Sequence, residues 1–294
     1  MPAIDELLKS AARRLTAVGI DSGRLDARLL LGAAFGREVW AHESVPVEPV
    51  AVARFEALLE RRLAREPVSR ILGKRAFWTL DLVVGPDTLD PRPDSETLVE
   101  AAIAAFADRP PPRRILDLGT GTGCLLLAVL SEFPEATGLG VDRLPGAIET
   151  ANENARRAGL EARAGFVTAD WNDMPREKAD LILSNPPYIA EATIALLAPE
   201  VARFDPHDAL AAGADGLDAY RSLFQVLPEL TTPQGIVVLE LGIDQRQVVS
   251  ALAMGVGFTA WHARRDLGGV ERALVLKWND TVDRHLNTDD FCLE

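Results

Sequence analysis

Apolar residues recur at helical spacing through the first quarter of the chain. The pattern covers residues 6–15, 26–36 and 52–64, and stretches that contain glycine or proline separate these segments. Apolar side chains three and four positions apart share one face of a helix, whereas glycine and proline interrupt helices. We therefore predict a small all-helical domain over residues 1–75 and expect it to dock a substrate.

A short segment with a period of two follows this helical region. Residues 76–90 alternate between apolar and polar positions and contain a Gly-Pro-Asp sequence. Alternation is typical of a strand, and such a tripeptide is typical of a turn. We predict a β-hairpin linker over residues 76–92 that turns at Gly-Pro-Asp and joins the two halves of the chain. A helix should begin near Pro93, because proline suits the first helical turn.

Strand-like and helix-like segments alternate over the rest of the chain. Short apolar segments predict strands at 114–119, 137–142, 162–170, 179–185, 235–242, 258–266 and 271–278. Helical periodicity predicts helices at 124–133, 145–159, 217–230 and 245–255. This order predicts an α/β domain over residues 93–278, with a mostly parallel sheet and helices on both faces. Ligands should bind at the carboxyl ends of its strands.

The last sixteen residues have no apolar period. Residues 279–294 contain five acidic side chains and one arginine. Segments of this composition bury too little apolar surface to fold. We predict an acidic, disordered tail and assign it no role.

The amino-acid composition indicates the class of protein and the compartment that we expect. The chain has 294 residues, of which 48% are hydrophobic and 26% charged, as in soluble globular proteins. No apolar run is long enough for a membrane span, and the first residues lack the apolar core of a signal peptide. Cys124 and Cys292 suggest no disulfide framework, so a reducing cytoplasm fits best. The four histidines are scattered, and we expect no metal.

Charge argues against nucleic acid as the main partner. The formal net charge is -13, whereas proteins that hold DNA by its phosphates usually carry a basic surface. One local exception spans residues 54–75, which contain seven basic residues and only three acidic ones. Two interpretations remain open for this stretch: a solvated helix face, or a docking surface for an acidic partner or RNA.

A glycine-rich loop follows the first predicted strand of the α/β domain. The loop residues are Gly119, Thr120, Gly121, Thr122 and Gly123. Glycines between a strand and a helix let the backbone approach a ligand closely. The spacing is G-x-G-x-G, whereas a dinucleotide-binding loop reads G-x-G-x-x-G.

Two acidic residues near this loop indicate which kind of ligand it binds. Asp117 ends the preceding strand, where its carboxylate would repel a pyrophosphate but attract an ammonium group. Asp142 ends the next strand and is placed to bind two ribose hydroxyls. We therefore predict a site for S-adenosylmethionine, which has an amino-acid end and a ribose but no phosphate. The alternative is a plain tight turn.

Asp170 and Trp171 close the third predicted strand of the same domain. Trp171 is predicted to stack on the adenine of the cofactor, and Asp170 to accept a hydrogen bond from its amino group. A partly buried tryptophan at the sheet edge is the alternative.

The sequence Ser-Asn-Pro-Pro-Tyr-Ile follows the fourth predicted strand. Asn185 offers an amide oxygen at the strand end, while Pro186 and Pro187 stiffen the chain and donate no N–H. The Asn185 oxygen and the Pro186 carbonyl can accept both hydrogens of a planar NH2 group, and Tyr188 can lie flat against its π system. We predict that these residues orient such a nitrogen toward a methyl donor. A proline turn that ends a strand is the alternative.

These motifs, together with segments at 66–84, 89–100, 204–223 and 266–274, resemble the peptide chain release factor N(5)-glutamine methyltransferases, the HemK/PrmC family. The resemblance implies a helical N-terminal domain and a seven-stranded methyltransferase domain. It implies methylation of the Gly-Gly-Gln glutamine in class I release factors, with S-adenosylhomocysteine as product. By motif, residues 119–123 and Asp142 would bind the cofactor with Trp171 at its adenine. Asn185 would contact cofactor and substrate, and residues 186–188 would shape the glutamine pocket.

Two departures and three rival functions accompany this resemblance. Residues 89–96 read Leu-Asp-Pro-Arg-Pro-Asp-Ser-Glu, where the family usually has Ile-Pro-Arg-Pro-Glu-Thr-Glu, and the acidic tail is the second departure. The motifs do not separate release factors from a ribosomal-protein glutamine as acceptor. A DNA adenine N(6)-methyltransferase would need a basic groove, and a non-catalytic binding protein would not need intact site motifs.

Overall fold

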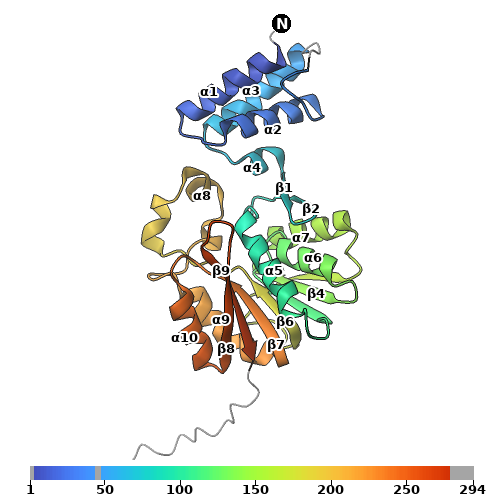
Figure 1. Ribbon diagram of the computed structural model, residues 1–294, viewed down its shortest axis with the longest axis vertical. Coiled ribbons are helices and arrows are strands. Elements are labelled where there is room, and N and C mark those ends of the chain that lie inside the picture. The colour runs from blue at the N-terminus through green and yellow to red at the C-terminus, as the bar shows by residue number, and fades with distance from the viewer. Residues whose placement is uncertain (1–2, 44–47, 279–294) are drawn as a thin grey trace, which may run out of the picture.

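The computed structural model describes residues 3–43 and 48–278 of the chain. The predicted acidic tail therefore lies outside the described residues. Figure 1 shows the described chain as a helical N-terminal part above a larger part built around one sheet. A small two-stranded hairpin lies between the two parts.

The N-terminal part is helical, as its apolar spacing predicts. Its helices are α1 (Ile4–Ala17), α2 (Gly23–Phe35), α3 (Pro49–Leu63) and α4 (Val68–Leu72). They enclose a core of their own, in which Leu15, Leu30, Phe55 and Leu59 are fully buried. Helix α2 ends at Gly36, which adopts the left-handed conformation that glycine tolerates best.

The hairpin turns earlier in the chain than predicted. Strands β1 (Lys74–Phe77) and β2 (Leu80–Val83) are antiparallel, and Phe77 pairs directly with Leu80. The turn therefore falls at residues 78–79, where Trp78 has a positive φ of 54°. The expected turn at residues 85–87 is wrong, because that sequence follows β2 and leads the chain past helix α7 (Pro145–Ala158).

A seven-stranded sheet forms the centre of the larger part and confirms the predicted α/β class. Its strand order is β5-β4-β3-β6-β7-β9-β8, and all neighbours are parallel except those of β9. The strands are β3 (Arg114–Leu118), β4 (Thr137–Asp142), β5 (Ala164–Thr168), β6 (Ala179–Ser184), β7 (Thr231–Glu240), β8 (Phe258–Arg265) and β9 (Glu271–Trp278).

Helices cover both faces of the sheet because alternate strand residues point to opposite sides. The 3-10 turn η1 (Pro93–Ser95) leads into α5 (Glu96–Ala105), which packs with α6 (Cys124–Glu132) and α7 on one face. Helices α9 (Asp218–Leu230) and α10 (Arg246–Gly255) pack on the other. Leu181 and Leu183 of β6 belong to the first core, whereas Ile182 between them belongs to the second.

A segment between β6 and α9 joins the two parts of the molecule. It contains η2 (Glu191–Leu196), α8 (Pro199–Phe204) and η3 (His207–Ala209), and α8 lies beside the helical part in Figure 1. Arg62 binds both Asp26 at 2.7 Å and Glu200 at 3.0 Å, and Arg65 binds Glu200 at 2.8 Å. These contacts tie α8 to helix α3.

The same segment is also tied to the linker between hairpin and sheet. Asp205 is buried and accepts ion-pair contacts from Arg70 and Arg92. Three arginines of the basic stretch at 54–75, Arg62, Arg65 and Arg70, are thus engaged within the molecule. These three side chains are therefore not part of the solvated face or external docking surface considered from the sequence.

Candidate functional site

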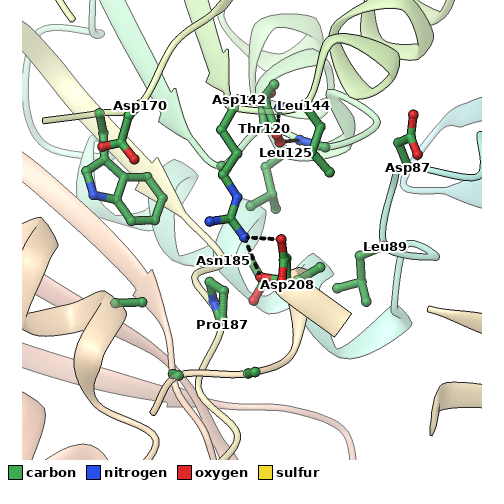
Figure 2. A pocket seen from close by; sticks show the side chains of 18 of the residues that line it. Asp87, Leu89, Thr120, Leu125, Asp142, Leu144, Asp170, Asn185, Pro187 and Asp208 are labelled. Atoms are coloured by element: carbon green, nitrogen blue, oxygen red, sulfur yellow. Dashed lines mark hydrogen bonds and ion pairs between the residues drawn. The ribbon is translucent and has the colours of Figure 1, made fainter. Parts of the chain in front are cut away.

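A cavity of about 400 Å³ lies at the carboxyl ends of the central parallel strands. Figure 2 shows side chains from these strand ends and from the segment before α9 converging on it. The predicted site residues that line it are Gly119, Thr120, Gly121, Thr122, Asp142, Asp170, Trp171, Asn185 and Pro187. Asp117, Gly123, Pro186 and Tyr188 lie behind this lining rather than in it.

The glycine loop forms one wall of the cavity and has a tightly specified backbone. Gly119 and Gly123 both have φ of 77°, a conformation that L residues rarely adopt. At Gly123 an added Cβ would also lie 3.2 Å from the ring of Phe166. The N–H groups of Gly119 and Thr120 both donate to the carbonyl of Val141, at 2.9 and 3.0 Å, which anchors the loop to β4.

Asp142 is held by the backbone on both sides. Its Oδ2 accepts from the N–H of Gly121 at 2.9 Å, and its Oδ1 accepts from the N–H of Leu144 at 3.0 Å. Each carboxylate oxygen keeps further lone-pair capacity. The side chain is therefore fixed in orientation and can still accept hydrogen bonds from a pair of hydroxyl groups in the cavity.

Asp117 lies beneath the loop and is almost fully buried. Its Oδ2 accepts from the Thr120 hydroxyl at 2.6 Å, whereas Oδ1 has no hydrogen-bond partner in the described part of the chain. Burial is the largest cause that raises the pKa of this carboxyl to about 7, and the charge of Asp142 also raises it. A buried carboxyl with one unpaired oxygen is costly to ionise, and a nearby positive charge would favour its ionised form.

Trp171 and Asp170 border the cavity at the end of β5. The Trp171 indole donates to Ser222 Oγ at 2.9 Å, and a Cβ built on Gly119 would lie 3.5 Å from its ring. The ring therefore flanks the glycine loop. Asp170 is exposed, and its Oδ1 accepts from the backbone and side-chain nitrogens of Asn172 at 2.9 and 2.8 Å. Its other oxygen is available to a ligand.

Asn185 directly follows β6 and lines the cavity (Figure 2). Its Nδ2 donates to Ser95 Oγ at 3.3 Å. Within the described residues, neither its Oδ1 nor the carbonyl of Pro186 accepts a hydrogen bond. Asn185 therefore offers an open amide oxygen at the cavity, and the unpaired carbonyl of Pro186 lies next to it in the chain, behind the lining. That both accept from one substrate NH2 group remains a prediction.

Tyr188 is anchored away from the cavity. Its hydroxyl donates to Glu240 Oε1 at 3.2 Å, and its carbonyl accepts from Gln245 Nε2 at 3.0 Å. Burial raises the pKa of the phenol above its ordinary value, and the negative charge of Glu240 adds to this. Tyr188 supports the Asn185 corner from behind, and its predicted stacking on a substrate remains a prediction.

Two functional candidates, Ser95 and Glu240, were missed by sequence reasoning. Ser95 ends η1, directly before α5, and Glu240 ends β7; the Ser95 hydroxyl donates to Glu240 Oε2 at 2.5 Å. Burial raises the pKa of Glu240 to about 7, although Ser95, Tyr188 and Arg272 each lower it. The available signal was an acid within the otherwise apolar stretch at 235–242.

Arg143 and Asp208 both line the cavity and form an ion pair with each other. The Arg143 guanidinium lies 2.9 Å from the Asp208 carboxylate. Arg143 follows β4 and Asp208 belongs to η3, so the pair connects the glycine-loop side to the segment before α9. Both side chains are more than half exposed, and surface pairs of this kind break at small cost.

Residues 3–43 and 48–278 contain no group of three or more potential metal-ligating side chains. Across the same residues, no helix combines the length and the apolar character that crossing a membrane requires.

Comparison with known proteins identifies relatives for both parts of the chain. A family model described as the PrmC N-terminal domain matches residues 6–73, and one described as a methyltransferase domain matches residues 112–251. The release factor glutamine methyltransferase of Rhodospirillum rubrum is 49% identical over 93% of this chain and 85% of its own. That of Cereibacter sphaeroides is 44% identical over 91% of this chain and 95% of its own.

Solved structures agree with the fold of the larger part. A methyltransferase from Pyrococcus furiosus aligns with a TM-score of 0.50 at 17% identity, over 77% of this chain and 98% of its own. At that identity the likeness concerns the fold alone.

Proposed function

Because the chain belongs to the release factor glutamine methyltransferase family, we propose that it methylates the glutamine side-chain amide nitrogen in the Gly-Gly-Gln motif of class I release factors. The methyl donor in this proposal is S-adenosylmethionine. The observation that carries the proposal is the pair of open acceptors, Asn185 Oδ1 and the Pro186 carbonyl, beside a cavity walled by the glycine loop.

The residues of the cavity fit this donor. Asp142 is fixed by two backbone N–H groups and presents free lone pairs to a ribose. Trp171 offers a flat apolar wall for an adenine, with the open oxygen of Asp170 near its edge. The open Oδ1 of Asp117 lies under the loop, where a cationic amino-acid end would stabilise its ionised form. When bound, the donor supplies an activated methyl group on a sulfonium.

The chain itself orients the accepting nitrogen. An amide nitrogen is a poor nucleophile because its lone pair is delocalised into the carbonyl. Asn185 Oδ1 and the Pro186 carbonyl would each accept one N–H of the glutamine and thereby fix the approach of the nitrogen. Orientation of this kind supplies up to about 7–11 kcal/mol of barrier reduction in well-aligned cases. Methyl transfer is direct, without a covalent enzyme intermediate.

The same two acceptors also select the substrate. A group that lacks the NH2 would leave both oxygens without donors in a partly buried site, and unpaired polar groups of this kind weaken binding strongly. The site is therefore proposed to reject glutamate and to accept a primary amide. Glutamine in a release factor and glutamine in a ribosomal protein share this chemistry, so the acceptor must be found by experiment.

The test is methyl incorporation from labelled S-adenosylmethionine into three acceptors in parallel. They are an unmodified class I release factor, dissociated ribosomal proteins and duplex DNA. Label on the Gly-Gly-Gln glutamine, identified by peptide mass spectrometry and absent from a Gly-Gly-Glu version, supports the proposal. Label only on ribosomal protein or only on DNA would refute the release factor as acceptor.

A further inference from the structure

Ser95 and Glu240 form a buried hydrogen-bond chain behind Asn185. Both side chains are about 2% exposed. Asn185 Nδ2 donates to Ser95 Oγ at 3.3 Å, and the Ser95 hydroxyl donates onward to Glu240 Oε2 at 2.5 Å. The three residues lie directly after β6, at the end of η1 and at the end of β7, so only the folded sheet brings them together.

We propose that Ser95 and ionised Glu240 are positioning residues that lock the Asn185 amide with its oxygen toward the substrate. This inference rests on the proposed function, because it explains how the acceptor for the glutamine NH2 is presented. Neither residue belongs to the Asn-Pro-Pro-Tyr motif. Ser95 lines the cavity and Glu240 lies behind it, and the role proposed for both is to orient Asn185.

The direction of the chain follows from the number of hydrogens available. A serine hydroxyl has one hydrogen, and Ser95 uses it on Glu240. Ser95 Oγ can then only accept from Asn185, which requires the NH2 end of the amide to face inward. The oxygen end is left facing the cavity. A flipped amide would place two acceptors against each other at Ser95 and would present an NH2 group to the NH2 of the substrate.

Ionised Glu240 stabilises this arrangement. Its second oxygen, Oε1, accepts from the Tyr188 hydroxyl at 3.2 Å, so both oxygens serve as acceptors. A protonated carboxyl carries a hydrogen of its own and would donate it to Ser95 or Tyr188. Donation to Ser95 would turn the serine hydroxyl toward Asn185 and favour the flipped amide. Protonation of Glu240 on Oε2 is thus expected to lower the activity.

The groups around Glu240 determine the pH at which it ionises. The groups that face it are Arg272 on β9, Asp94 in η1, Tyr188 after β6, Tyr220 on α9 and Cys124 at the start of α6. Arg272 favours the ionised form, whereas Asp94 and burial oppose it. The pKa of Glu240 lies at about 7 as a result, so activity should rise as pH increases through this value.

Kinetics of methyl transfer to the release factor provide the first test. Ser95→Ala and Glu240→Gln should each lower kcat about tenfold or more, the effect of losing about one buried hydrogen bond, with cofactor affinity unchanged. Ser95→Thr keeps the hydroxyl and should retain most of kcat. Ser131→Ala removes an exposed hydroxyl of α6 that donates to Ala128 and should leave the rate unchanged. Glu240→Gln should also lose the rise of activity near pH 7.

Several outcomes of these kinetics would overturn the proposal. One is a Glu240→Gln enzyme with wild-type kcat and the same pH profile. Another is an equal loss in Ser95→Ala and Ser95→Thr, because side-chain volume rather than the hydroxyl would then matter. Thermal unfolding of each variant establishes that it is folded.

A spectroscopic readout separates this inference from the proposed function. The side-chain NH2 signal of Asn185, assigned by its absence from Asn185→Ala, should shift with pH near 7 in the wild type. It should move in Ser95→Ala and stop titrating in Glu240→Gln. The same signal in all three proteins would overturn the positioning role. A shifting signal in a protein that methylates no release factor would instead refute the proposed function and leave the positioning role intact.

Discussion

Asp142 Oδ2 accepts a hydrogen bond from the backbone N–H of Gly121 at 2.9 Å. The carboxylate at the end of β4 therefore holds the middle of the glycine loop that follows β3. One side chain thus shapes the loop and, in the proposed function, binds the ribose of the cofactor.

Replacement of Asp142 tests this double role. Asp142→Ala removes both backbone contacts and the proposed ribose contacts, so cofactor affinity should fall by a factor of about 10 to 100, the range for a charged hydrogen bond. Isothermal titration with S-adenosylhomocysteine measures the change. Glu153→Ala, which removes an exposed acid from α7 paired with Arg156, should leave affinity unaltered. Unchanged binding in Asp142→Ala would exclude it from the ribose site.

Trp171 provides a second test of the cofactor site. Trp171→Ala should weaken binding of S-adenosylhomocysteine about 3- to 10-fold, because an aromatic stacking contact contributes about 0.5–1.5 kcal/mol. Trp171→Phe keeps a flat ring and loses the indole contact to Ser222, so its affinity should lie between wild type and Trp171→Ala. Equal affinity in all three proteins would show that the adenine does not lie on this ring.

Arg62 connects the helical part to the sheet part and should matter for stability. Its guanidinium is 7% exposed and binds both Asp26 and Glu200. Arg62→Ala leaves two acids without their buried partner, a change that costs about 3–5 kcal/mol in comparable cases. Urea unfolding measures it. Lys9→Ala removes an exposed ion pair with Asp5 and should change the free energy of unfolding little. A similarly small change for Arg62→Ala would show that Arg62 does not stabilise the contact between the two parts.

Asp117 should make stability depend on pH. Its pKa is raised to about 7 by burial, so the folded state binds a proton more tightly than the unfolded state. Stability from this group is complete below about pH 4 and is lost as pH rises toward 7. Asp117→Asn does not ionise and therefore does not lose this stability as pH rises. Its free energy of unfolding relative to wild type should rise by on the order of 2 kcal/mol between pH 5 and 8, and a constant difference would contradict this account.

The parts of the site that the sequence predicted share one physical basis. The carboxyl ends of neighbouring parallel strands meet at one edge of a sheet, so the glycine loop, Asp142, Trp171 and Asn185 converge once the strand order is known. Those strands were predictable because buried parallel strands are short apolar runs bounded by polar residues.

Other features were not predictable because they depend on contacts between distant segments. Ser95 meets Glu240 across 145 positions, and Arg62 meets Glu200 across 138. No local pattern encodes either pair. The hairpin turn was misplaced for a different reason: Trp78 adopts a left-handed backbone, which is uncommon outside glycine and asparagine, so Gly-Pro-Asp was the stronger local turn signal.

The central claim is that Asn185 presents its amide oxygen to the substrate nitrogen. The most direct measurement is the single-turnover rate of methyl transfer to an unmodified class I release factor, with cofactor affinity determined on the same samples. Asn185→Ala and Asn185→Asp should each slow transfer at least about 100-fold, as loss of an oriented contact does, while the cofactor still binds. The control is Asn152→Ala, which removes an amide that donates to the Ile148 carbonyl on α7. Its transfer rate should match that of the wild type. Near-normal transfer by Asn185→Ala would contradict the account.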